Sequence, residues 1–111
     1  MQRNVSHLQK PALRTAFQRD EMTLILNTYG HLVASGEARD YAIGMYPDKA
    51  IFAIFRHAAE QPSWRIEKIP QLARKQGMYV IYGMAGQVLR RGHELSTVLR
   101  LFQRKRFAIV K

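Results

Sequence analysis

The chain has 111 residues, no cysteine and a formal net charge of +10, so disulfides, thiolate nucleophiles and zinc–thiolate sites are excluded. Its length fits one compact domain, and a hydrophobic content of 47% is too high for a disordered chain. No apolar run is long enough to span a membrane, and residues 1–16 lack the apolar stretch of a secretory signal, so we expect a cytoplasmic protein with no membrane partner.

The N-terminal part is predicted to be an arm followed by a helix. Residues 1–16 are basic, contain Pro11 and show no period, which is typical of a mobile basic arm preceding a domain at 17–111. A helix is predicted over 19–35, and Gly36 is suited to end it. Its apolar residues recur at helical spacing and are expected to line one stripe: Met22, Ile25, Leu26, Tyr29, Leu32 and Val33.

Two strands come next, at 40–46 and 50–57, joined by a turn at Pro47 and expected to pair as an antiparallel hairpin. The second run is apolar at both alternations up to Phe55. That pattern indicates a central strand covered on both faces, or a tight contact with a partner.

The second half is predicted to contain three more strands and a second helix. A strand at 63–69 ends at a proline and is followed by a basic connector at 71–76. A second hairpin is predicted from 78–83 and 87–91, and an amphipathic helix from 94–105. The element order is α-β-β-β-β-β-α, so we expect an α+β single domain with a mainly antiparallel sheet of about five strands.

Four segments are long and distinctive enough to carry a family resemblance between Phe17 and about Phe102. The chain resembles an alphaproteobacterial family, domain of unknown function 2794, through 29–43 (YGHLVASGEARDYAI), 50–56 (AIFAIFR), 64–79 (WRIEKIPQLARKQGMY) and 88–102 (VLRRGHELSTVLRLF). The resemblance implies a bacterial cytosolic setting. It implies no activity, cofactor or catalytic residue.

Positive charge is concentrated in the second half. Residues 64–111 hold eleven Lys and Arg against two acids, whereas residues 20–63 hold three against six. The guanidinium group of arginine can bind two phosphate oxygens at once, so the basic second half of the chain predicts a polyanion-binding surface. The same residues are also compatible with a solvated surface that keeps the domain soluble. The predicted binding residues are Arg65, Lys68, Arg74, Lys75, Arg90 and Arg91.

Strand alternation puts Arg65 and Lys68 on opposite faces of their strand, and likewise Arg90 and Arg91, so one sheet face cannot hold all six. Tyr79 and Tyr82 are candidates for stacking on nucleic-acid bases, with burial in the core as the alternative.

Gly92 and His93 precede the second helix and are candidates for holding an anion at its start, or simply for ending the strand and capping the helix. No metal-ligand spacing, nucleophile elbow or glycine-rich phosphate loop is present, so we expect no metal, no cofactor and no catalytic residues. An enzyme site joining Arg91 and His93 to Glu37 or Asp40 is the least favoured alternative.

The sequence therefore favours a non-enzymatic module that binds the backbone of RNA or DNA. The alternative is a protein-interaction or assembly factor. It would pair the apolar strand at 50–57, or the terminal residues 107–111, with a protein partner or a second copy in a homodimer.

Overall fold

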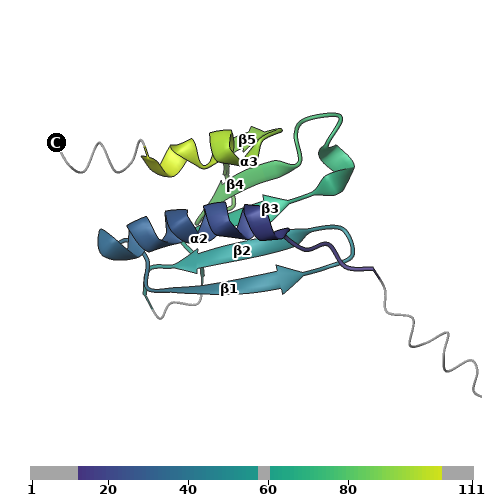
Figure 1. The fold of residues 1–111 in the computed structure, drawn as a ribbon. Coiled ribbons are helices and arrows are strands. Elements are labelled where there is room, and N and C mark those ends of the chain that lie inside the picture. Colours follow the sequence, from purple (N-terminus) through teal and green to yellow (C-terminus); the bar gives the residue numbers. More distant parts are fainter. Residues whose placement is uncertain (1–12, 58–60, 104–111) are drawn as a thin grey trace, which may run out of the picture.

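The computed structural model describes residues 13–57 and 61–103, and it confirms the α+β class and the predicted element order (Figure 1). The first four strands are a little shorter than predicted, and the fifth is shifted by one residue. The elements are α2 (Arg19–Ala34), β1 (Asp40–Met45), β2 (Ala50–Phe55), β3 (Trp64–Lys68), a 3₁₀ turn (Pro70–Leu72), β4 (Tyr79–Gly83), β5 (Val88–Gly92) and α3 (Leu95–Val98).

The five strands form one antiparallel sheet in the order β1-β2-β3-β4-β5, so each strand lies beside its neighbour in sequence. Short connections favour this arrangement, because an antiparallel pair needs only a tight turn whereas a parallel pair needs a crossover. Both helices pack on the same face of the sheet, with α2 across the β1–β3 half and α3 across the β4–β5 half (Figure 1).

The core lies between the helices and this face. Phe52 is aligned with Ile43 and Ile66, and Ile66 with Ile81, so one row of apolar side chains runs from β1 to β4. Phe52, Ile66 and Ile81 are fully buried, whereas Ile43 at the sheet edge is 44% exposed. Ile25 and Leu32 of α2 are fully buried above this face, as the helical period predicts.

Both ends of α2 have local stabilising contacts. The Gln18 N–H donates to Oε1 of Glu21 at 2.7 Å, which is one half of a capping box. Gly36 has φ of +81°, the left-handed conformation expected of a residue that ends a helix.

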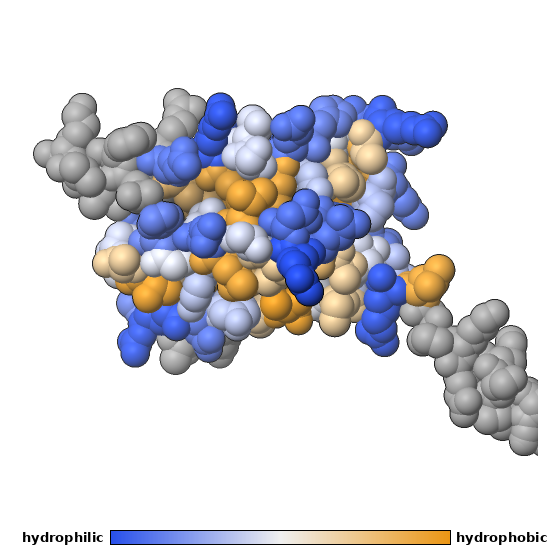
Figure 2. All heavy atoms as spheres, viewed as in Figure 1, coloured by the Kyte–Doolittle hydropathy of each residue, from blue (hydrophilic) through white to orange (hydrophobic). Residues whose placement is uncertain are grey.

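The stripe predicted for α2 is only partly buried. Met22 and Tyr29 are half-buried, and Leu26 and Val33 are 39% and 44% exposed. A stripe of six apolar residues is wider than the surface that the sheet offers, since β1 is the last of the described strands under this side of the helix. Apolar side chains therefore reach the surface beside α2, over β1 (Figure 2).

Three other expectations can be compared with the structure. The strand at 50–57 was predicted to be a central strand covered on both faces, or a strand in tight contact with a partner. β2 is indeed central, between β1 and β3, so it offers no free edge for pairing, but Ile51, Ala53 and Phe55 are half-exposed and its second face is not fully covered. The terminal residues 107–111 lie outside the described residues, and so do most of the predicted arm and the end of the predicted second helix. Residues 14–16 contact the sheet, so the ordered contacts begin before residue 17.

The second helix includes Leu95–Val98, and residues 100–103 are helical again. Its predicted stripe is buried as expected, with the exposed fraction no higher than 6% at any of its four positions: Leu95, Val98, Leu99 and Phe102. This stripe packs the helix over β4 and β5, so the helix does not cover the opposite face of the sheet.

Candidate functional site

The strand register places part of the predicted basic cluster on the sheet face opposite the helices. Aligned residues of neighbouring strands point to the same side of a sheet. Arg65 is aligned with Tyr82, Glu67 with Val80, and Val80 with Arg91, while the alternate positions of these strands face α2 and α3. We call this side the open face, because no helix in the described part of the chain covers it (Figure 1).

Arg65 lies over an aromatic ring on the open face. Its guanidinium carbon lies 4.7 Å from the centroid of the Tyr82 ring, and its Nε donates to Oε2 of Glu67 at 3.1 Å. Among the described residues only Glu67 accepts a hydrogen bond from Arg65, so both terminal NH₂ groups remain for a ligand. A guanidinium fixed in this way loses little conformational entropy when it binds phosphate.

Positive charge exceeds negative charge around this pair. Glu67 is 3% exposed and also forms an ion pair with Lys49, whose Nζ lies 3.6 Å from Oε1. Arg91 lies on the same face beyond Val80, and its Nη1 is buried with no hydrogen-bond partner in the described part of the chain. Lys49 and Arg65 therefore share the carboxylate of Glu67, while Arg91 lies on the far side of Val80, which is completely buried.

Two of the predicted site residues lie on the other face. Lys68 is 8% exposed and its Nζ donates to Oε1 of Glu21 at 2.9 Å and to the Ala16 carbonyl at 3.1 Å. Tyr79 is 7% exposed and its hydroxyl donates to Oε2 of Glu21. Neither side chain has a face left for a nucleic-acid ligand, so the structure excludes both from the candidate site.

The contacts of Glu21 also control its ionisation. Burial by itself would raise the pKa of Glu21, but hydrogen bonds from Lys68, Tyr79 and the Gln18 backbone together lower that pKa below its usual value. Burial and the hydrogen bond to Glu21 raise the pKa of Tyr79. The group is thus a charged, buried structural contact that joins the first turn of α2 to β3 and β4.

The other predicted cations are dispersed. Arg90 faces the helices and its Nη1 donates to the Thr97 carbonyl at 3.3 Å. Arg74 and Lys75 are exposed in the loop between β3 and β4. This loop lies at the end of the sheet where β5 finishes, because a Cβ on Gly77 would lie 2.4 Å from the carbonyl of Gly92.

Gly92 and His93 form no separate anion site in this arrangement. Nδ1 of His93 lies 3.1 Å from the Ala73 carbonyl, and Gly92 packs against Gly77. The residue that precedes α3 is Glu94, whose carboxylate disfavours an anion there. The alternative in which Gly92 ends the strand describes this geometry better.

The residues of the possible enzyme site are not brought together, since Glu37 and His93 line different cavities. Asp40 lies on β1 and Arg91 on β5, at opposite edges of the sheet. Four strand spacings of about 4.8 Å separate them. Among residues 13–57 and 61–103, no group of three or more acidic or histidine side chains is placed to hold a metal ion. None of the described helices is long and apolar enough to cross a membrane.

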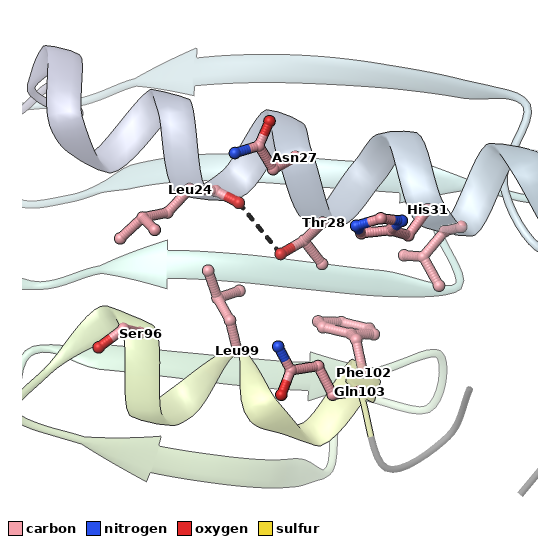
Figure 3. Close-up of a pocket in the computed structure, with 9 residues that line it drawn as sticks. Leu24, Asn27, Thr28, His31, Ser96, Leu99, Phe102 and Gln103 are labelled. Atoms are coloured by element: carbon pink, nitrogen blue, oxygen red, sulfur yellow. Dashed lines mark hydrogen bonds between the residues drawn. The ribbon is translucent and has the colours of Figure 1, made fainter. Parts of the chain in front are cut away.

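A groove between α2 and α3 is a second concave feature, with a volume of about 230 Å³ (Figure 3). Its floor is Leu32, Leu99 and Phe102, and polar side chains such as Asn27 and His31 line its rim. None of the described residues that line it is a lysine, an arginine or a carboxylate, and its volume is below the roughly 300–1,000 Å³ of small-molecule sites. We interpret it as a packing gap between two helices.

Lys49 and Phe55 belong to the open face, although the sequence did not single them out. Lys49 sits in the turn before β2, and its role depends on the pairing of Ile51 with Glu67. Strand alternation already placed Arg65 and Glu67 on one side of β3, so the missing signal was the register between strands.

Comparison with known protein families gives one match, to the model of a protein of unknown function, DUF2794, over residues 15–99. The match covers the sheet and both helices, α2 and α3. The chain belongs to this family. No curated protein and no solved structure matches it. Within this DUF2794 protein, every residue of the open face described above lies inside the matched range.

Proposed function

We propose that this DUF2794 protein is a non-enzymatic module that binds the phosphate backbone of RNA or DNA through the open face of its sheet. The observation that carries the proposal is the Arg65–Tyr82 stack, with Arg91 and Lys49 on the same face and Glu67 as the carboxylate that Arg65 and Lys49 share. Phosphates favour arginine forks, and a base can stack beside an arginine that lies on a ring.

The surrounding charge supports the same function. A formal net charge of +10 raises the local concentration of polyanions and speeds their encounter with the protein. Arg74 and Lys75 are exposed in the loop at one end of the open face, where they extend the path available to a phosphate backbone. A chain without cysteine also fits the reducing cytoplasm, where RNA and DNA are present.

The competing explanation is a basic surface that serves only solubility, and a matched pair of variants separates the two. The test variant is Arg65→Gln/Arg91→Gln, which removes two positive charges from the open face. The control is Arg19→Gln/Arg100→Gln, which removes two positive charges from exposed positions on the helix side. Fluorescence anisotropy with labelled single-stranded and duplex RNA and DNA is measured across a salt series.

We expect the wild-type protein to bind with micromolar affinity or better and to weaken steeply with salt, because binding releases counterions. The open-face variant should bind at least about ten-fold more weakly, and the magnitude of its salt slope should fall by about 1.4–1.8, as two lost phosphate contacts require. The helix-side variant should change affinity less than about three-fold. Equal losses in both variants, or no binding at low salt, would refute the proposed face.

A further inference from the structure

Strand β1 forms an edge of the sheet, because among the strands of residues 13–57 and 61–103 only β2 lies beside it. The Tyr46 N–H donates to the Lys49 carbonyl, and the register continues from this pair along the hairpin. Backbone groups of a strand point alternately to its two sides. The N–H and C=O groups of Tyr41, Ile43 and Met45 therefore point away from the sheet.

Two of these outward-pointing backbone groups form hydrogen bonds with side chains. The Tyr41 N–H donates to Oδ1 of Asp40 at 2.8 Å, and Nη1 of Arg14 donates to the Met45 carbonyl at 3.0 Å. Both contacts are exposed, so another backbone can replace them at little cost. No described residue bonds to the outward groups of Ile43, which lies midway between the two contacts.

An apolar surface accompanies this edge. Tyr41, Ile43 and Met45 are 41%, 44% and 47% exposed on the helix side of β1. The Tyr29 ring packs edge-to-face on Tyr41 with centroids 5.0 Å apart, so this side of α2 faces β1. Leu26 and Val33 lie on the same side of α2 as Tyr29, three and four residues away, so they extend the apolar surface beside β1.

The opposite edge of the sheet is unsuitable for pairing. β5 has a register irregularity opposite Ile81 and Tyr82, which twists that edge out of line. It also presents Arg90 and Arg91 next to each other, so a second copy would bring like charges together. Strand β1 has no basic residue between Asp40 and Met45.

We propose that β1 is a self-association edge at which two copies of this chain pair antiparallel about a two-fold axis through Ile43. In this register Ile43 lies opposite the same residue of the second copy, and Tyr41 lies opposite the partner's Met45. All outward-pointing N–H and C=O groups of β1 therefore form hydrogen bonds between the two copies. The Tyr41 N–H then breaks its hydrogen bond to Asp40 and donates to the Met45 carbonyl of the partner subunit. That carbonyl in turn gives up its hydrogen bond from Arg14. Two five-stranded sheets become one continuous sheet.

A second copy fits this surface better than an unrelated chain because the surface is self-complementary. The two-fold axis lays the apolar strip of one copy along the same strip of the other. Five side chains with about two-fifths of their surface exposed contribute roughly 400 Å² per copy, about half of the ~800 Å² per partner in a standard interface. The paired backbones add to this area, and we expect a dimer with a dissociation constant in the micromolar range.

Sedimentation analysis of the full chain, over concentrations up to ~1 mM, tests the dimer. Ile43→Lys places two like charges at the axis and should weaken association at least about ten-fold. Met84→Lys is the matched control, since Met84 is 58% exposed in the turn between β4 and β5, and it should associate like the wild type. Far-UV circular dichroism checks that both variants fold. A wild type that is monomeric throughout, or an unchanged Ile43→Lys dimer, would overturn the proposal.

The natural lack of cysteine gives an independent readout. Under mild oxidation Ile43→Cys should cross-link two copies, because only a residue near a two-fold axis meets its own counterpart. Met84→Cys should stay uncross-linked under the same conditions. Asp40→Ala frees the Tyr41 N–H and should strengthen association by several fold if strand pairing forms the interface. Weaker association in Asp40→Ala, or equal cross-linking of both cysteine variants, would contradict β1 pairing.

Discussion

Substitution of Glu21 by glutamine probes the buried contact between α2 and the sheet. The change leaves the shape nearly intact but removes the negative charge that faces Nζ of Lys68 at 2.9 Å. Lys68 then remains as an uncompensated cation in a site where its side chain is only 10% exposed. Breaking one partner of a buried ion pair costs about 3–5 kcal/mol, and we expect a value near the lower limit because glutamine still accepts from Tyr79.

Urea denaturation at pH 7 measures the free energy of unfolding directly. A loss of about 3 kcal/mol corresponds to a fall of roughly 10–20 °C in Tm for a domain of this size. The double variant Glu21→Gln/Lys68→Met removes both charges. It should be more stable than the sum of the two single losses predicts, because neither partner is left charged and unpaired.

The pH dependence has a definite sign. The folded-state pKa of Glu21 lies below its usual value of 4.5, so the unfolded chain takes up the proton first as the pH falls. The stabilisation is complete above the unfolded pKa and is lost as the pH drops through the folded pKa. The stability difference between wild type and Glu21→Gln should therefore be constant near neutrality and shrink in acid. A difference below about 0.5 kcal/mol at pH 7, or one that does not shrink, would refute this account.

Two further substitutions test the fold and the candidate site. Gly77 has φ of +98° and a Cβ there would meet the Gly92 backbone, so Gly77→Ala should cost more than about 2 kcal/mol in urea denaturation. Gly86→Ala, with φ of +86° but no atom within 4 Å, should cost only about 1 kcal/mol, and equal losses would contradict the steric argument. Tyr82→Ala should weaken single-stranded nucleic-acid binding by about 1–3 kcal/mol in anisotropy titrations, through lost stacking and lost support for Arg65. Tyr82→Phe keeps the ring and should bind like the wild type, and a similar loss in both would rule out stacking.

Local sequence pattern was sufficient for the elements and their order, because helical and strand periods are properties of neighbouring residues. The alternation in β3 correctly separated Arg65 and Glu67 from Trp64 and Ile66. The family was also recognisable from contiguous segments, and the match over residues 15–99 confirms it.

Tertiary structure alone decided which of these residues are available to a ligand. Lys68 and Tyr79 are a basic and an aromatic residue on the same strands as Arg65 and Tyr82, so the sequence could not tell the two pairs apart. Each contacts Glu21, which lies 47 positions from Lys68 and 58 positions from Tyr79 in the chain. The register between strands brought Lys49 to Glu67, and the limited width of the sheet left Leu26 and Val33 exposed beside β1. These outcomes depend on how segments that are distant in the sequence pack together. A periodic pattern within one segment does not show which other segment of the chain it packs against.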